Sequence, residues 1–176
     1  MASTDRIKRL IRNIPDFPKP GIQFKDITPL LASPGGFSDA IEAMLHASPS
    51  DVDLVAAIES RGFLFGAPMA MALHVGFVPI RKPGKLPGPA FEQHFDLEYG
   101  SSTLAMHQDA VAPGQRVLLV DDLLASGGTL LAAAQLIERE GGEVAHTTVL
   151  LELADMDGRE VLAAGGLKSF SSVLTV

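Results

Sequence analysis

The sequence contains no cysteine, and this absence excludes a disulfide scaffold, a zinc site with cysteine ligands and thiol catalysis. It contains no uninterrupted apolar run near the roughly 20 residues that a membrane-spanning helix needs. Its N-terminus carries a charged, periodic segment instead of the apolar core of a signal peptide. We therefore expect a soluble, cytoplasmic protein with no membrane partner.

Positive charge is also scarce, because 14 Lys and Arg residues face 21 Asp and Glu residues and the formal net charge is −7. A protein that binds a nucleic-acid backbone usually presents a basic face, so we expect no nucleic-acid partner. The basic residues nevertheless form two clusters, which are Arg6, Lys8, Arg9 and Arg12, and Arg81, Lys82 and Lys85. Such local positive charge favours either a site for an anionic small molecule or a solvated surface.

The chain has no internal repeat or composition break, and 47% of its 176 residues are hydrophobic, which predicts one globular domain over residues 1–176. Near the N-terminus, apolar residues at helical spacing predict an amphipathic helix with Thr4 or Asp5 as its cap. These apolar residues are Ile7, Leu10, Ile11 and Ile14. The prolines of residues 15–21 end this helix, and a second helix is expected after residues 33–36.

From residue 54 onward, short apolar runs alternate with helical patterns. Strands are predicted over residues 54–58, 77–80, 117–120 and 144–153, and helices over residues 65–73 and 129–140. Alternating strands and helices predict an α/β fold with a mostly parallel sheet flanked by helices on both faces. Ligands of such sheets bind beyond the carboxyl ends of the strands, so the residues after each strand are the candidate site.

The most informative of these segments is residues 117–129, VLLVDDLLASGGT. The backbone amides of Ser126 to Thr129, at the start of a helix and next to glycines, suit a phosphate dianion. Carboxylates beside a phosphate would repel it unless they accept hydrogen bonds from sugar hydroxyls, a role open to Asp121 and Asp122. The segment therefore predicts a site for a phosphorylated ribose.

Two other interpretations of this segment account for it less well. A P-loop would need Gly-Lys followed by Ser or Thr, and a dinucleotide fingerprint would need Gly-x-Gly-x-x-Gly after a strand; the sequence has neither. An ordinary strand-to-helix turn with surface aspartates would explain the two glycines, but it does not account for all thirteen residues of the pattern.

The same segment resembles the phosphoribosyl-pyrophosphate signature of type I phosphoribosyltransferases. Further motifs resemble the adenine phosphoribosyltransferases of that family, in the family's order: PDFP at 15–18 before Pro20-Gly21, FKDIT at 24–28, SRGFLFG at 60–66, RKPGKLPG at 81–88 and LEYG at 97–100. The resemblance implies transfer of a phosphoribosyl group from phosphoribosyl pyrophosphate to N9 of adenine, giving AMP and pyrophosphate in purine salvage. It also implies a homodimer.

The resemblance assigns roles to individual residues. The implied pyrophosphate contacts are Glu59, Ser60, Arg61, Arg81, Lys82 and Lys85, with Arg61 also catalytic. The implied ribose 5-phosphate contacts are Asp121, Asp122, Ala125, Ser126, Gly127, Gly128 and Thr129. For Arg61 and for the cluster at 81–85, a solvated surface charge is the alternative. Mg²⁺ is expected to be bound with phosphoribosyl pyrophosphate, through ligand oxygens and water rather than by a dedicated protein cage.

The resemblance also implies an N-terminal helix and hood over residues 1–36 and a lid over residues 81–106. Glu98 in the lid is the implied catalytic group that exchanges a proton with the purine. Adenine is expected to contact Gln23, Phe24, Lys25 and Leu123. The alternative for Phe24 is a core position under the loop, and the alternative for Glu98 is a solvent-facing carboxylate. Gln23 stands where the family usually has an aliphatic residue, and Lys25 and Ser126 stand where it usually has arginine and threonine.

Two rival functions have different signatures. A xanthine or hypoxanthine phosphoribosyltransferase generally lacks the 61–66 context combined with this hood. A purine-responsive regulator would usually add a basic DNA-binding domain, for which an acidic chain of 176 residues has no room. The sequence therefore favours the adenine enzyme.

Overall fold

The computed structural model of the chain describes residues 2–96 and 100–176. Its elements, in chain order, are α1 (Ala2–Arg9), β1 (Arg12–Pro15), β2 (Gln23–Asp26), α2 (Thr28–Ala32), α3 (Pro34–His46), β3 (Leu54–Ile58), α4 (Arg61–Leu73), β4 (Gly76–Ile80), β5 (Ala90–Asp96), β6 (Ser101–His107), β7 (Arg116–Leu124), α5 (Gly128–Arg139), β8 (Glu143–Glu152), α6 (Gly158–Ala164) and β9 (Phe170–Thr175).

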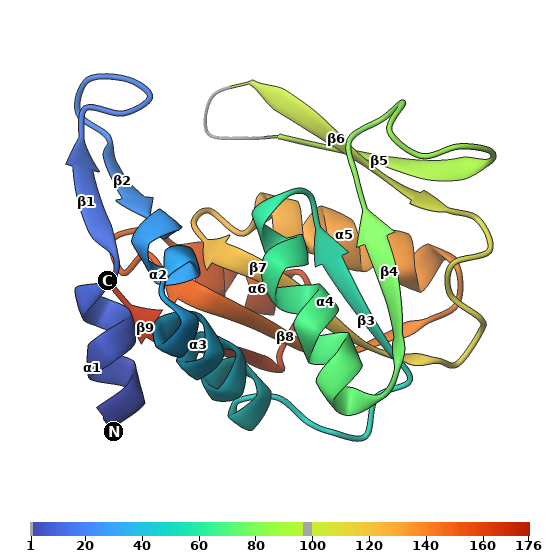
Figure 1. The fold of residues 1–176 in the computed structure, drawn as a ribbon. Helices are drawn as coiled ribbons and strands as arrows, with labels where there is room; N and C mark the ends of the chain where they lie inside the picture. Colours follow the sequence, from blue (N-terminus) through green and yellow to red (C-terminus); the bar gives the residue numbers. More distant parts are fainter. Residues whose placement is uncertain (1, 97–99) are drawn as a thin grey trace.

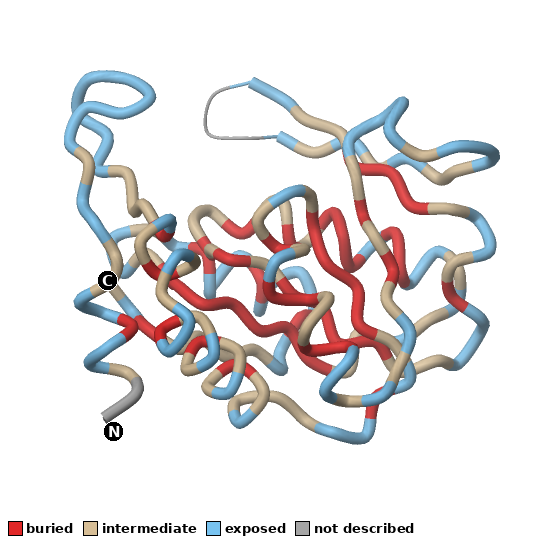
Figure 2. The backbone as a smooth tube through the Cα atoms, in the orientation of Figure 1, coloured by how far each residue is buried: buried red, intermediate tan, exposed pale blue. Residues whose placement is uncertain are grey.

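A five-stranded parallel sheet in the order β4-β3-β7-β8-β9 forms the centre of the molecule (Figure 1). Its inner strands are largely buried along their length, because a parallel sheet is covered on both faces. In β3, Val55 and Ala57 pack with α1 to α4 on one face, whereas Ala56 and Ile58 pack with α5, α6 and the β5–β6 hairpin on the other. The buried residues accordingly follow the sheet (Figure 2). The predicted fold class is confirmed.

Local signals located several elements correctly. The strand predicted over 54–58 is β3, and Ser33 begins α3 by accepting a hydrogen bond from the amide of Gly36. None of the helices formed by the described residues is long and apolar enough to span a bilayer.

The predicted N-terminal helix is wrong at both ends. It begins at Ala2, before the expected caps Thr4 and Asp5, and it stops at Arg9, so that Ile14 lies in β1. The reason is an antiparallel pairing of β1 with β2, fixed by Arg12, which donates two hydrogen bonds of 3.0 and 2.6 Å to Asp26. A partner strand ten residues away therefore overrides the helical spacing.

Two other elements are longer than predicted. Helix α4 begins at Arg61 rather than at residue 65, and β7 continues past Val120 to Leu124 because its last residues pair with β8. The β1–β2 ribbon and the β5–β6 hairpin project from the same side of the sheet (Figure 1). The hairpin joins the sheet at its foot, where Arg81 and Ala105 exchange backbone hydrogen bonds.

Candidate active site

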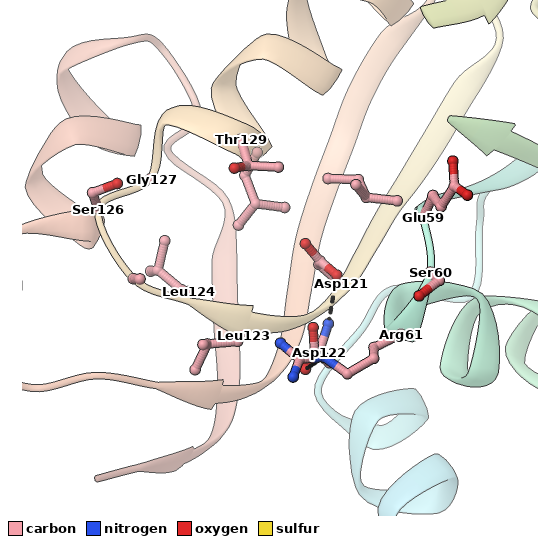
Figure 3. A pocket seen from close by; sticks show the side chains of 13 residues that line it. Glu59, Ser60, Arg61, Asp121, Asp122, Leu123, Leu124, Ser126, Gly127 and Thr129 are labelled. Atoms are coloured by element: carbon pink, nitrogen blue, oxygen red, sulfur yellow. Dashed lines mark hydrogen bonds and ion pairs between the residues drawn. The ribbon is translucent and has the colours of Figure 1, made fainter. Parts of the chain in front are cut away.

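A cavity of about 530 Å³ opens where β3 and β7 leave the sheet (Figure 3). It is lined by Ile58, Glu59, Ser60, Arg61, Asp121, Asp122, Leu123, Leu124, Ala125, Ser126, Gly127, Thr129 and Leu130. Three of the residues predicted for pyrophosphate and six of those predicted for the sugar phosphate therefore meet around one space, although some 60 positions separate them in the chain. The predicted residues that do not line this cavity are Arg81, Lys82, Lys85 and Gly128. The general rule that ligands bind at the carboxyl edge of a parallel sheet explains the location.

An ion pair links the two sides of this cavity. Nε of Arg61 lies 2.8 Å from Oδ2 of Asp122, whose side chain is buried (Figure 3). Burial raises the pKa of Asp122, and the guanidinium of Arg61 opposes that rise. Arg61 therefore pairs with a buried carboxylate in the cavity, although 39% of its own side chain is exposed.

Asp121 occupies a different environment from its neighbour. Its Oδ1 accepts a hydrogen bond of 2.8 Å from the backbone amide of Asp122. Burial raises the pKa of Asp121 well above its ordinary value, and the charge of Asp122 adds to the rise. The two adjacent carboxyl groups therefore differ in their readiness to ionise, and Asp122, next to Arg61, is the one better held in its charged form.

Gly62 allows the start of α4 to approach the end of β7 closely. A Cβ at this position would lie 2.8 Å from Oδ1 of Asp121 and 3.2 Å from the Val120 carbonyl oxygen. A side chain on residue 62 would thus push α4 away from the paired aspartates. The glycine of the SRGFLFG motif sets the distance between Arg61 and β7.

The loop before α5 presents backbone amides to the cavity. Gly127 precedes the first helical residue with a φ of +87°, a conformation that favours glycine. No side chain among the described residues caps this helix end, so its amides can serve an anion. Ser126 and Thr129 also line the cavity. Gly128, the first residue of α5, lies against β5, because a Cβ there would be 3.1 Å from the Asp96 carbonyl oxygen.

The basic cluster at 81–85 is tied to the site through Glu59. Arg81 donates to the Glu59 carboxylate at 3.0 and 3.3 Å, and the backbone amide of Lys82 donates to it at 3.0 Å. These donors lower the pKa of Glu59. Nη1 of Arg81 donates to the Lys85 carbonyl oxygen at 2.9 Å. Glu59 and Arg81 therefore form an ion pair, which the sequence pattern did not indicate.

The residues predicted to contact adenine divide between two cavities. Leu123 lines the first cavity, whereas Gln23 and Lys25 line a second one of about 1010 Å³. Phe24 faces the opposite way, with the Arg61 guanidinium 5.4 Å from its ring centre. Glu98, the predicted proton-transfer residue, lies outside the described residues.

The second cavity also contains residues that the sequence analysis missed. Its far wall is formed by Leu153, Ala154, Asp155, Met156 and Val176. Their position could have been predicted, because they follow the carboxyl ends of β8 and β9 and so belong to the same edge of the sheet. The amide of Leu153 donates to the Leu124 carbonyl oxygen at 3.0 Å, which makes the walls of the two cavities neighbours.

Comparison with known proteins identifies the family to which this fold belongs. The family model of the phosphoribosyl transferase domain matches residues 36–171. The parallel sheet, with its loop between β7 and α5, is that of the type I phosphoribosyltransferases.

Individual relatives narrow the class. The chain is 53% identical over 172 residues to the adenine phosphoribosyltransferase of Cutibacterium acnes, covering 98% of this chain and 97% of that protein. It is 54% identical over 170 residues to that of Thermobifida fusca, covering 95% and 96%. The crystal structure of the enzyme from Thermoanaerobacter pseudethanolicus matches with a TM-score of 0.93 at 50% identity, covering 98% and 99% of the two chains. The chain belongs to the adenine phosphoribosyltransferase family.

Proposed function

We propose that the protein transfers the phosphoribosyl group of phosphoribosyl pyrophosphate to N9 of adenine, forming AMP and pyrophosphate in the salvage of purines. The observation that carries this proposal is the pair of adjoining cavities. One is lined by carboxylates and helix-start amides, and the other lies beneath the β1–β2 ribbon. Arg61 contacts Asp122 in the first and lies beside Phe24 of the ribbon.

The ribose 5-phosphate is assigned to the first cavity. The loop from Ala125 to Thr129 offers backbone amides and two hydroxyls to the phosphate, as the helix dipole favours. Asp121 and Asp122 accept hydrogen bonds from the ribose hydroxyls. Burial raises the pKa of both carboxyl groups. Arg61 and the hydroxyls of the bound sugar counteract this rise at Asp122 and favour its charged form.

In the reaction, the bond between C1 of the ribose and the pyrophosphate oxygen breaks, and its electron pair leaves with pyrophosphate. The N9 lone pair forms the new bond to C1, and N9 loses its proton, for which Glu98 is the proposed acceptor. Negative charge grows on the leaving group, so cations placed beside it stabilise the transition state. Arg61, Arg81, Lys82 and Lys85 are the proposed cations, with the backbone around Glu59 and Ser60.

Mg²⁺ would accompany phosphoribosyl pyrophosphate and add positive charge beside the leaving group. The donor set fits this arrangement, because Asp122 is already paired with Arg61 and Asp121 already accepts an amide hydrogen bond. Within residues 2–96 and 100–176, no group of three or more His, Asp or Glu side chains forms a metal cage. Pyrophosphate and ribose oxygens, with water, would supply its ligands.

Adenine is assigned to the second cavity. Gln23 lies opposite Pro15 of β1, which has no amide hydrogen to donate to the Gln23 carbonyl oxygen. Because backbone direction alternates along a strand, we assign the backbone groups of Gln23 and Lys25 to the other edge of β2, which lies toward the sheet (Figure 1). A carbonyl there would accept from the 6-amino group and an amide would donate to N1 of adenine. Because the backbone recognises the base in this arrangement, the presence of Gln23 instead of an aliphatic residue does not change which base is bound.

We also propose a cytoplasmic homodimer. Leu64 and Met71 are 41% and 78% exposed and lie seven residues apart on α4, which places them on one face of that helix. Burial of this face against a second copy would remove apolar surface from water. Sedimentation at about twice the chain mass is expected, whereas an active monomer would contradict the proposal.

Pyrophosphate release tests the activity directly. The protein is mixed with phosphoribosyl pyrophosphate, Mg²⁺ and one of three bases: adenine, hypoxanthine or xanthine. Release of pyrophosphate with adenine, but not with hypoxanthine or xanthine, supports the proposal. Preferred release with hypoxanthine or xanthine would indicate an oxopurine enzyme, and binding without release would indicate a ligand sensor.

A further inference from the structure

Helix α6 lies directly beneath the loop assigned to the sugar phosphate. A Cβ on Gly158, the first residue of α6, would collide with the Ala125 carbonyl oxygen and lie 2.8 Å from Cδ1 of Leu124. In the other direction, a Cβ on Gly127 would lie 2.8 Å from the Gly158 carbonyl oxygen and 3.2 Å from Cγ1 of Val161. Backbone therefore rests on backbone, and a shift of α6 moves the loop.

A second group of contacts fixes α6 to the sheet. Arg159 follows Gly158 and donates two hydrogen bonds, of 2.8 and 2.5 Å, to the carboxylate of Glu152 at the end of β8. Ser172 of β9 donates to the same carboxylate at 2.7 Å. The Arg159 guanidinium also lies 4.6 Å from the ring centre of Phe170. Two side chains, from α6 and β9, thus bind the buried carboxylate of Glu152 on β8.

The register of the sheet connects this carboxylate to the loop. Glu152 pairs with Leu124, the last residue of β7 before the loop begins at Ala125. The Arg159 donors lower the pKa of Glu152, so the carboxylate stays charged and the two-bond contact is kept at neutral pH. The loop continues from the end of β7, and it packs against the first turn of α6. The Glu152–Arg159 pair links α6 to β8, next to the end of β7.

Helix α6 cannot hold this position by itself. It has seven residues, and helices this short are unstable without tertiary contacts. Its buried Leu162 packs into the core next to α5 and fixes the middle of the helix. Arg159 is the contact that fixes its first turn, where Gly158 meets the loop.

We propose that Glu152 and Arg159 are a positioning pair that holds the first turn of α6 beneath the loop 125–129 and thereby sets the affinity for the sugar 5-phosphate. Neither residue lines either substrate cavity. The inference rests on the proposed function, because it assumes that this loop binds the phosphate of phosphoribosyl pyrophosphate. Removal of the pair is expected to weaken phosphate binding much more than adenine binding.

The test compares four single variants and one double variant in the full-length protein; the fourth single variant is Arg159→Lys, and the double variant combines Glu152→Gln with Arg159→Met. Arg159→Met removes the guanidinium and keeps the apolar stem, and Glu152→Gln keeps the shape of its side chain but removes the charge. Arg116→Met is the matched control, because Arg116 pairs with Asp51 and Glu143 at the start of β7, far along the strand from the loop. Each variant is measured for ribose 5-phosphate binding, for KM of both substrates, for kcat and for thermal midpoint.

Arg159→Met and Glu152→Gln are expected to weaken ribose 5-phosphate binding and to raise KM for phosphoribosyl pyrophosphate about tenfold, with KM for adenine within about twofold of wild type. Arg159→Lys should recover part of the loss, because lysine keeps the charge but not the two-bond geometry. The double variant should bind no more weakly than the worse single variant, since the residues act as one unit. Arg116→Met should leave every KM unchanged even where it lowers the thermal midpoint.

Three results would overturn the inference: unchanged ribose 5-phosphate binding in both variants, equal effects on the two substrates, or additive losses in the double variant. If Arg159→Met does not fold, the isosteric Glu152→Gln variant decides the outcome. Failure of the proposed function is recognised separately, because the wild-type protein would then release no pyrophosphate with adenine.

Discussion

Replacement of Arg61 by methionine removes the cation that faces the carboxylate of Asp122 and keeps an unbranched stem. In the wild-type protein Nε lies 2.8 Å from Oδ2, and Asp122 is only 6% exposed. Breaking a fully buried ion pair from one side costs about 3–5 kcal/mol. Because 39% of the Arg61 side chain is exposed, water screens the pair, and we expect a loss of about 1–2 kcal/mol in the free energy of unfolding at neutral pH.

The sign of the pH dependence follows from the Asp122 carboxyl. Burial raises its pKa and Arg61 opposes the rise, so the folded-state pKa is higher in the variant than in the wild type. Below the unfolded-state pKa the carboxyl is protonated in both proteins, folded or unfolded, and their stabilities differ least. As the pH rises through the folded-state values, the variant must ionise a buried carboxyl that has lost its cation, so its deficit grows.

Urea unfolding of both proteins at about pH 4 and about pH 8 measures this deficit. A deficit that is equal at both pH values, or larger at the lower one, would refute the role given to Arg61 at Asp122. Initial rates of pyrophosphate release supply the second readout, because loss of a cation beside the leaving group is expected to lower kcat/KM about 100-fold or more. Arg61→Lys should recover stability better than activity, since lysine keeps the charge without the planar fork.

Three further changes test other contacts of the site. Gly62→Ala places a methyl group 2.8 Å from Oδ1 of Asp121, so a loss of about 1–3 kcal/mol in unfolding free energy and weaker ribose 5-phosphate binding are expected; unaltered stability would contradict the close approach. Gln23→Leu should keep a preference for adenine over hypoxanthine of roughly a thousandfold, because the backbone reads the base, and a ratio near unity in competition assays would assign that role to the amide side chain. Glu59→Gln should lower the free energy of unfolding by about 1 kcal/mol at neutral pH, because the charged carboxylate binds Arg81. The difference from wild type should vanish as the pH falls through the lowered pKa of Glu59, and a constant difference in urea titrations across pH would contradict this.

The fold was predictable where its signals are local. The apolar run of β3 is bounded by breakers, and α3 begins with Ser33 followed by proline and glycines, so neither needs a distant partner. The course of the chain around Ile14 was not predictable in this way. Its spacing suits a helix, and only the pairing of Arg12 with Asp26 across the ribbon decides for a strand.

The candidate site shows the same division. The segment around Asp121 and Gly127 was recognisable because a strand, a small-residue loop and a helix start follow one another in the sequence. The pairing of Glu59 with Arg81 was not, because no local pattern states which carboxylate a given arginine meets across the sheet. The separation of Gln23 from Leu123 into different cavities likewise depends on how the ribbon stands over the sheet edge.

The proposed function requires one product molecule to span the two adjoining cavities, and a crystal structure of the protein with AMP tests this most directly. We expect the 5′-phosphate on the backbone amides of residues 126–129, the ribose hydroxyls on Asp121 and Asp122, and the 6-amino group within about 3 Å of the Gln23 carbonyl oxygen. A structure with the phosphate away from this loop, or with the adenine ring outside the cavity beneath the β1–β2 ribbon, would contradict the account.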